Sequence, residues 1–447
     1  MQAAGRAYDG KYMAEVNMGY NGSENFAKGH RWGFFPSIAL GYNISEESFF
    51  EPLRKVITSM KLRGSWGLVG NDQIGGERFI YMPTINLSGK GFTTGIDQNY
   101  GLSGPVYTRY ENNSITWEVG EKINLGIDLQ LLNSLNIVVD IFRETRRDIF
   151  QKKGTIPTYL GTGNTDVFGN LAEMKNQGLD LSIDYNKAFS KDFYMNFKGT
   201  FTYAHNEITK YDEAPKYAFQ SKVGQSANVS QGYLSNGLFL DEAEIDRYNQ
   251  QMGSTLGAGD IKYLNVSNMH GYGDDIVDVD DWTWIGNPTV PEIVYGFGPS
   301  FKYKNWDFSF FFQGVAKTSL FMSGFHPFGD NSLRNVLQFV ANDRWSPTNQ
   351  NVDAKYPRLT RKTSLNNTNP GNSGRTSDYW MRDGSFLKLK NMELGYTFKR
   401  MRFYISGSNL LTFSKFDLWD PEQGGGSGLK YPTQRVFNVG FQMTFNN

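Results

Sequence analysis

The residues with the clearest capacity for chemistry lie in an acidic run, YGDDIVDVDD, at positions 272–281. Carboxylate oxygens at short intervals along a loop are ligands that Ca²⁺ prefers. Asp274, Asp278 and Asp281 are therefore the candidate metal ligands of this chain. The alternative is an acidic loop that water alone solvates, and no other cofactor is indicated.

Catalytic constellations do not stand out elsewhere. Asp274 with Asp278, or Glu242 with Glu244, could act as paired carboxylates in glycoside hydrolysis, but sequence spacing does not fix the separation that this reaction needs. The chain has no Cys, four dispersed His and no GxSxG segment, which argues against thiolate-zinc, cysteine and serine chemistry. The GGGSG run at 424–428 lacks the GK[ST] of a phosphate loop. We therefore do not expect an enzyme.

Aromatic residues outside the predicted strands are the candidate ligand contacts. Flat rings can stack on the faces of sugars, and the alternative is that they pack the loops against each other or against a protein partner. The candidate substrate-binding residues are Trp282, Trp284, Trp345, Trp380 and Trp419.

The charge and hydropathy of the chain exclude two classes of protein. The 45 Lys and Arg residues balance 45 Asp and Glu residues, so there is no positive surface for nucleic acid. No run of 18 apolar residues occurs, so a transmembrane helix is not expected. The N-terminal residues carry no secretion signal, so a membrane barrel would lack the start of the protein in this sequence.

The elements that must position these loops are strands, because apolar and polar residues alternate with a period of two. Near the C-terminus, Val439 and Phe441 share one face, and Asn438 and Gln442 share the other. About twelve such segments are found, each near the ~10-residue length of a tilted membrane strand. They are 11–20, 36–45, 59–69, 120–132, 134–145, 173–186, 193–206, 292–303, 306–316, 386–398, 401–411 and 434–445.

Two local irregularities are predicted. In 386–398 the apolar face changes, because Leu387 and Leu389 are out of phase with Met392 and Leu394, which indicates a β-bulge. The connection 45–58 is predicted to contain a short helical piece.

The connections between strands alternate in length. Tight turns are expected at Asn133-Ser134, Lys187–Asp192, Lys304-Asn305 and Lys399-Arg400. This asymmetry is typical of outer-membrane barrels, whose long loops are extracellular, whereas a soluble sandwich has similar loops at both ends. The long connections are 71–118, 146–172, 207–290, 317–384 and 412–433.

The polar faces of the strands carry charges that a globular core would not accept. Aromatic residues near strand ends would form girdles at the headgroup level, although aromatics also favour strands in general. A water-filled or plugged lumen accommodates the charged residues, which are Lys61, Arg63, Asp128, Asp140, Asp180, Asp184 and Lys198.

Several stretches, in this order and at these intervals, resemble the SusC-like TonB-dependent outer-membrane transporters. The resemblance extends from near the start of the chain to its end. The stretches include RWGFFPSIALGYNISEE (31–47), LRGSWGLVGN (62–71), EMKNQGLDLSIDY (173–185), GDIKYLNV (259–266), IGNPTVPE (285–292), SDYWMRDGSFLKLKNMELGYTF (377–398), SNLLTFSKFDLWDPE (408–422) and YPTQRVFNVGFQMTF (431–445).

The resemblance implies an all-β fold, a transmembrane antiparallel β-barrel of about 22 strands with a plugged lumen. Residues 1–447 would supply about twelve C-terminal strands, so the chain is expected to be a fragment of this barrel. The implied function is import of a bulky nutrient, commonly an oligosaccharide. The implied partners are outer-membrane lipid, a SusD-like surface lipoprotein and TonB-ExbB-ExbD, which would act through the missing N-terminal region.

The acidic run departs from the calcium motif that the resemblance implies at this place. Family members often carry DxNGDGxID there, whereas this chain has His270 and Tyr272 at the first and third positions and Asp275 in place of the Gly. Two other classes of protein stay open. They are a secreted or surface β-rich glycan-binding protein and, with less support, a β-sandwich glycosidase. The identity of the substrate is not predicted.

Overall fold

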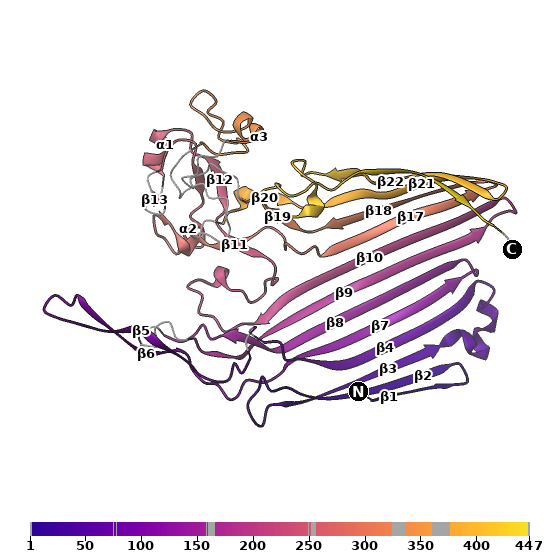
Figure 1. Ribbon diagram of the computed structural model, residues 1–447, viewed down its shortest axis with the longest axis horizontal. Helices are drawn as coiled ribbons and strands as arrows, with labels where there is room; N and C mark the ends of the chain where they lie inside the picture. Colours follow the sequence, from indigo (N-terminus) through magenta and orange to yellow (C-terminus); the bar gives the residue numbers. More distant parts are fainter. Residues whose placement is uncertain are drawn as a thin grey trace. The chain divides into compact units, whose positions relative to one another are not determined.

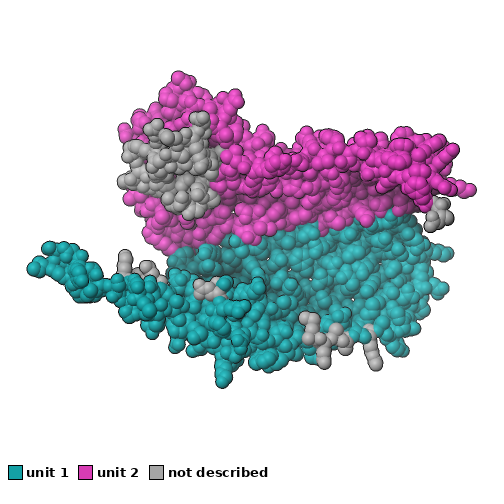
Figure 2. All heavy atoms as spheres, in the orientation of Figure 1, with its two compact units in different colours: residues 1–186, 202–215, 221–227 teal, residues 187–201, 216–220, 228–447 magenta. Residues whose placement is uncertain are grey.

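The computed structural model is all-β and describes residues 2–74, 76, 78–157, 159, 166–248, 250–251, 256–323, 336–359 and 376–445. Two compact units are distinguished (Figure 2). Unit 1 comprises residues 1–186, 202–215 and 221–227, and unit 2 comprises residues 187–201, 216–220 and 228–447. None of the described helices is long and apolar enough to cross a membrane.

One large sheet dominates, with the strand order β1-β2-β3-β4-β7-β8-β9-β10-β17-β18-β21-β22-β23 (Figure 1). The strands of this sheet occur in chain order, and adjacent strands from β1 to β9 and from β17 to β23 are antiparallel. The bounds are β1 Gln2–Tyr8, β2 Tyr12–Gly22, β3 Trp32–Asn43, β4 Ile57–Asn71, β7 Glu118–Leu131, β8 Leu135–Lys152, β9 Phe168–Ala188, β10 Phe193–Lys210, β17 Ile293–Tyr303, β18 Trp306–Ala316, β21 Phe386–Phe398, β22 Met401–Ser414 and β23 Val436–Met443.

All twelve predicted segments correspond to strands of this sheet, and β1 is an addition. β1 joins β2 through a turn in which Asp9 and Gly10 have positive φ. Its sequence, QAAGRAY, is poor in alternating large apolar residues, so the period-two pattern does not mark it. The strand predicted at 11–20 therefore finds one of its partners within this chain.

The predicted β-bulge is confirmed at Lys390. The register of β21 shifts between Leu389 and Asn391 against β22, and it also shifts against β18. Leu389 lies opposite Phe312, and Met392 lies opposite Phe310. The extra residue therefore keeps Leu389 and Met392 on the same face of the sheet, which explains the change of phase in the sequence.

The short connections are also confirmed. Asn133, Lys304 and Lys399 have φ values of 54°, 53° and 54° within tight turns, a left-handed conformation that suits two-residue hairpins. The helical piece predicted in 45–58 consists of two 3₁₀ segments, η1 Ile44–Glu46 and η2 Ser48–Leu53.

The long connections contain small elements that sequence reasoning left as loops. In unit 1, β5 Thr84–Thr94 and β6 Tyr100–Arg109 form a hairpin. Parts of the predicted loops 146–172, 207–290 and 317–384 lie outside the described residues. In unit 2 the small elements are η4 Ala218–Gln220, β11 Ser230–Gly232, β12 Ser235–Leu238, α1 Glu242–Arg247, β13 Gln250–Gln251, β14 Ile261–Tyr263, α2 Val266–Met269, β15 Ile276–Val277, η5 Val279–Asp281, β16 Thr283–Ile285, β19 Ser319–Phe321, α3 Gln338–Asn342, η6 Asp378–Trp380, β20 Met381–Asp383 and η7 Pro421–Gln423.

Candidate functional site

The polar face of unit 1 is organised by Arg63 of β4. Its guanidinium donates to both carboxylate oxygens of Asp128 at 2.8 and 2.9 Å, and to Asp140 of β8 at 3.0 Å. Gly126 of β7 lies between Arg63 and Asp140 in the sheet register. A Cβ at Gly126 would lie 2.5 Å from the Asp140 carboxylate and 2.8 Å from the guanidinium. The glycine therefore lets the arginine cross a whole strand.

The polar face of unit 2 repeats this arrangement around Arg402 of β22. Arg402 donates to Asp307 of β18, with an Nε–Oδ1 distance of 3.1 Å, and to Glu393 of β21. Gly395 of β21 lies opposite Asp307, and a Cβ there would lie 2.5 Å from the Asp307 carboxylate. The charged groups of Arg402, Asp307 and Glu393 thus form ion pairs with each other across neighbouring strands, so no second layer of protein is needed to pair them.

The opposite face of the sheet is apolar and exposed. In unit 1, Leu125 and Ile141 lie side by side in the register and are 63% and 60% exposed, and in unit 2 Ile405 is 54% exposed. Monomeric soluble proteins rarely expose apolar faces of this extent to water. A transmembrane barrel directs such a face to lipid.

In unit 2, a row of aromatic side chains lies at the end of this apolar face, next to the short turns. Each ring lies directly opposite the next on the adjacent strand. Trp306 and Tyr396 have ring centroids 4.7 Å apart, and Phe403 and Phe441 have centroids 5.1 Å apart. This is the arrangement expected of an aromatic girdle. The row comprises Tyr303, Trp306, Tyr396, Phe403 and Phe441.

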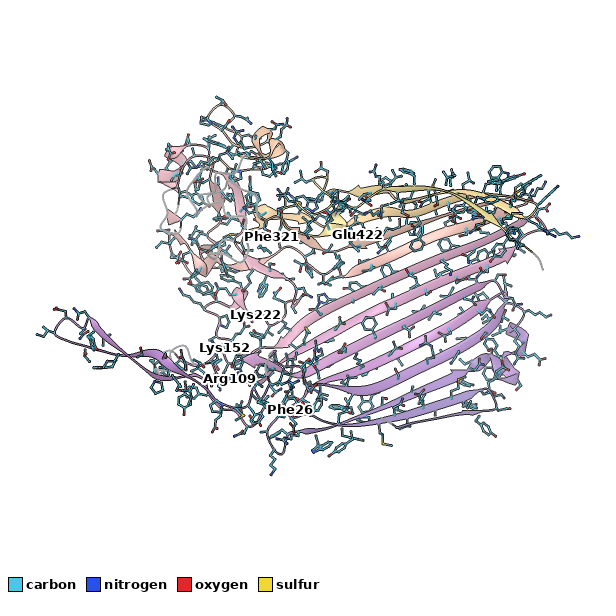
Figure 3. All side chains as sticks on the ribbon, in the orientation of Figure 1. Phe26, Arg109, Lys152, Lys222, Phe321 and Glu422 are labelled. Carbon is cyan, nitrogen blue, oxygen red and sulfur yellow. The ribbon has the colours of Figure 1, made fainter. Side chains whose placement is uncertain are left out.

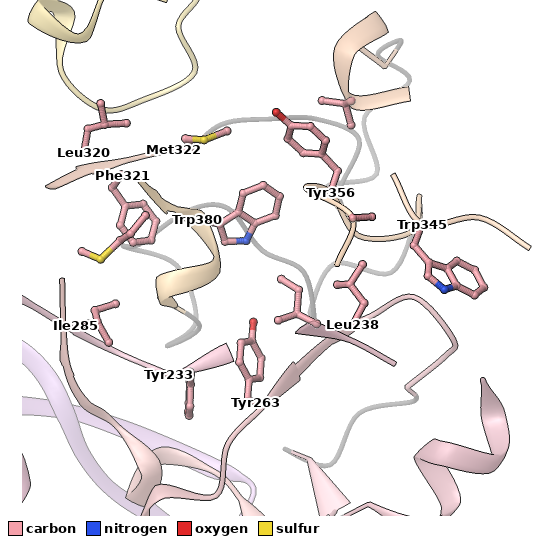
Figure 4. Close-up of a cluster of buried hydrophobic side chains, with 14 of the residues drawn as sticks. Tyr233, Leu238, Tyr263, Ile285, Leu320, Phe321, Met322, Trp345, Tyr356 and Trp380 are labelled. Atoms are coloured by element: carbon pink, nitrogen blue, oxygen red, sulfur yellow. The ribbon is translucent and has the colours of Figure 1, made fainter. Parts of the chain in front are cut away.

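The long loops of unit 2 fold around their own hydrophobic cluster (Figure 4). Trp380 and Trp345 belong to this cluster and are almost completely buried. Trp282 and Trp419 are half-buried and pack against it. Trp284 is half-buried on β16, where it lies opposite Gln231. The structure therefore brings four of the five predicted tryptophans together, and burial assigns Trp345 and Trp380 to loop packing.

A buried ion pair links distant parts of this loop cluster, and sequence reasoning did not find it. Asp260 is fully buried and accepts hydrogen bonds from Arg358 at 2.6 and 2.8 Å. It also accepts from the backbone N–H of Gly257 at 2.9 Å. The hydrogen bonds from Arg358 to Asp260 raise the pKa of that guanidinium, although burial opposes its charge. The two residues are 98 positions apart in sequence, so no local sequence pattern predicts their contact.

The acidic run uses its carboxylates as backbone acceptors. Asp281 is fully buried and accepts from the N–H groups of Ser267 at 2.9 Å and Asp278 at 2.8 Å. Asp278 accepts from the N–H of Asp280, and Asp274 accepts from that of Ile276. Across the described part of the chain, no three His, Asp or Glu side chains are grouped as metal ligands would be. Calcium binding here stays a prediction, which a Ca²⁺ titration of loop unfolding would test.

A pocket of about 560 Å³ lies where the loops of unit 2 meet β18 and β21. Phe321 and Glu422, labelled in Figure 3, line it. Its other polar groups include Gln313, Thr318 and Ser319. The volume lies within the range of about 300–1,000 Å³ that is usual for small-molecule sites.

The pocket wall is fixed by two lysines of β21. Lys388 is almost fully buried and pairs with Asp420 and Glu422, and Lys390 contacts Glu422 at 2.6 Å. Burial disfavours the Glu422 carboxylate, but the hydrogen bonds from both lysines outweigh it and hold its pKa below the ordinary value. The loop that contains η7 is thereby tied to the polar face of the sheet.

A sheet with one apolar exposed face and one charged face is typical of membrane-spanning β-barrel proteins. The family described as "TonB dependent receptor-like, beta-barrel" matches residues 4–410, and the chain belongs to this family. TonB-dependent receptor P3 of Formosa agariphila is 26% identical, over 98% of this chain and 44% of its own length. TonB-dependent receptor SusC of Bacteroides thetaiotaomicron is 27% identical, over 97% of this chain and 42% of its own length.

The solved structures support the same fold. The structure of the RagAB peptide transporter aligns with 99% of this chain and 47% of its own chain, with a TM-score of 0.71 and 20% sequence identity. At this identity the likeness concerns the fold alone. This chain thus spans less than half the length of the curated relatives it matches.

Proposed function

We propose that these strands form the C-terminal part of a plugged outer-membrane barrel that imports a bulky nutrient, with long loops outside the cell. The division of the sheet into an exposed apolar face and a face of laterally paired charges carries this proposal. Arg63 and Arg402, with their carboxylate partners, suit a water-filled or plugged lumen. Residues 4–410 match the TonB-dependent receptor family, which supports the same function.

The nutrient that we propose is an oligosaccharide. RagAB, whose structure resembles this chain, is described as a peptide transporter, so a peptide is the alternative ligand to be tested. The pocket where the loops of unit 2 meet β18 and β21 offers hydroxyl and amide groups and the Glu422 carboxylate beside Phe321, which suits a ligand rich in hydroxyls. Trp282, Trp284 and Trp419 are the half-buried tryptophans from which we propose stacking contacts, whereas Trp345 and Trp380 hold the loops together.

The partners that we propose are a SusD-like surface lipoprotein and TonB-ExbB-ExbD, the latter acting through a region outside residues 1–447. The hairpin β5–β6 supports a protein partner at the loop end. Its side chains Leu87, Phe92 and Ile96 are strongly exposed, and an isolated two-stranded hairpin is at best marginally stable in water. Contact with another protein would cover these side chains.

Uptake by cells tests this function. Cells that lack the gene would be complemented with the native gene or with Trp284→Ala, and would be given labelled oligosaccharides or labelled peptides. Trp306→Phe, on the apolar face, is the matched control. We expect uptake of oligosaccharide that depends on TonB, is reduced by Trp284→Ala and is unchanged by Trp306→Phe.

The outcomes separate the parts of the proposal. Uptake that persists without TonB, or binding of glycan at the surface without uptake, would contradict import and favour a surface glycan-binding protein. Uptake of peptide in place of oligosaccharide would correct the ligand.

Protease added to intact cells should cut within 207–290 and 317–384 when the lipoprotein is absent, and cleavage at Asn133-Ser134 instead would reverse the orientation.

A further inference from the structure

A groove lies on the apolar face of unit 1, apart from the loops and the charged face described above. Its volume is about 590 Å³, and its lining is almost entirely apolar. It lies on the side of the sheet opposite to the carboxylate partners of Arg63. Met13, Gly41 and Arg63 also border it, but the alternation along β2, β3 and β4 directs these positions to the other face. The residues that line it on the apolar face are Tyr8, Tyr12, Ala14, Leu40, Tyr42, Leu62, Gly64 and Leu125.

The sequence makes this groove by alternating small and large residues across the strands. Ala14 lies opposite Leu40, which lies opposite Gly64, which lies opposite Leu125. Leu40 and Leu125 are more than half exposed and form ridges. The small residues Ala14 and Gly64 lie next to these ridges and leave a trough along them. A Cβ at Gly64 would meet only Leu125, at an ordinary contact distance of 3.5 Å. Gly64 therefore leaves open space in the groove, and a methyl side chain there would not clash with its neighbours.

One end of the trough is closed by a polar cluster. The rings of Tyr12 and Tyr42 are stacked, with centroids 5.1 Å apart. Both hydroxyls donate to the same carboxylate oxygen of Glu47, at 2.7 and 3.3 Å. The Lys11 ammonium lies 3.3 Å from Glu47 and 3.8 Å from Asp9. The cluster thus offers one ammonium and two carboxylates, and it lies at the short-turn end of the strands.

We infer that this groove binds one glycerophospholipid with an amine headgroup, from the leaflet at the short-turn side of the sheet. An acyl chain occupies the trough over Ala14 and Gly64, where it continues the lipid contact of the surrounding apolar face. The lipid phosphate accepts from the Lys11 ammonium, and the headgroup amine lies against the carboxylates of Asp9 and Glu47. A zwitterion complements this cluster, because the cluster itself carries both signs of charge.

The adjoining residues favour lipid over protein as the occupant. Tyrosines with an apolar ring and a hydrogen-bonded hydroxyl are enriched where hydrocarbon gives way to headgroups. Beyond the groove, the same face continues as exposed aliphatic side chains at Ile127 and Ile141, which suit acyl chains and offer no polar group to orient a protein.

Lipid retained by the native protein tests the inference. The protein would be extracted from outer membranes in mild detergent, washed, and analysed by native mass spectrometry and lipid extraction. Gly64→Leu fills the trough, and Ala14→Leu fills it from the neighbouring strand. Val439→Leu places the same side chain on the apolar face of unit 2, outside the groove, and is the control. Lys11→Gln removes the cation while leaving the trough intact.

We expect one retained phosphatidylethanolamine in the native protein and in Val439→Leu, and loss of that lipid in Gly64→Leu and Ala14→Leu. In Lys11→Gln, which lacks the proposed donor to the lipid phosphate, the amount of retained lipid should fall although the trough is unchanged. Heat modifiability on gels identifies folded protein, so a variant that fails to fold is set aside and the other trough variant decides. Equal retention in native protein and the folded trough variant would overturn the inference. So would photocrosslinks from residue 40 to a second copy of the chain in place of lipid.

Discussion

Arg63 and Asp140 form an ion pair of 3.0 Å although a whole strand separates them. Arg63 belongs to β4 and Asp140 to β8, and Gly126 of β7 is the residue over which the guanidinium passes. Arg402 and Asp307 repeat this relationship across Gly395 in unit 2. Arginine suits such a position because its planar fork can bind two carboxylates while remaining charged.

The crossing depends on the absence of a side chain at position 126. Gly126→Ala places a methyl group 2.5 Å from the Asp140 carboxylate, so either the pair opens or the strands shift. Overpacking of this kind costs about 1–3 kcal/mol. Urea unfolding in lipid vesicles should show this loss for Gly126→Ala and almost none for Gly64→Ala, whose Cβ has room. Equal stability of the two variants would mean that the pair does not require the glycine.

The two faces of β23 should respond differently to charge. Val439 is 88% exposed on the apolar face and Asn438 is on the polar face. Val439→Arg should cost about 2–4 kcal/mol if the residue lies near the bilayer midplane, and Asn438→Arg should cost much less. Folding into bilayers under urea measures both variants. A similar loss of stability in the two would show that the faces are wrongly assigned.

The sheet was predictable from sequence because each strand carries its own signal. The period-two pattern found twelve strands, and the change of phase around Lys390 found the bulge. β1 and the β5–β6 hairpin lack a clean apolar alternation, so they were missed. The loop cluster was not predictable, since Asp260 and Arg358 meet only through tertiary folding. Burial of Trp345 and Trp380 likewise depends on residues far away in sequence.

The buried pair of Asp260 and Arg358 should be the main polar support of the loop cluster. Asp260→Asn leaves the partly buried Arg358 guanidinium without its counter-charge, and breaking a buried pair in this way costs about 3–5 kcal/mol. Limited proteolysis should therefore cut the 256–359 region of this variant much faster. Asp343→Asn, which removes the exposed contact to Lys355 at 3.6 Å, should change the rate little. Matching rates for both variants would contradict the assignment.

The loop around η7 should loosen in acid. Because the pKa of Glu422 is lower in the folded loop than in an unfolded chain, its contribution to stability is complete above the ordinary glutamate pKa of about 4.3. That contribution is lost as the pH falls through the lower, folded pKa. Proteolysis of residues 415–430 by pepsin should accelerate over this acidic range. In Glu422→Gln the acceleration should be smaller, and an unchanged pH profile would contradict this role.

The central claim is that one face of this sheet contacts lipid and the other contacts water. Since residues 1–447 contain no Cys, a single cysteine introduced along β7 is the one site for a spin label in this part of the protein. Collisions with oxygen, which concentrates in lipid, and with a water-soluble nickel complex would be measured at 123, 124, 125, 127 and 130 in the native protein in bilayers. The account predicts an alternation, with high oxygen and low nickel access at Ile123, Leu125 and Ile127, and the reverse at Asn124 and Gln130. Nickel access that is equally high at all five positions would contradict it.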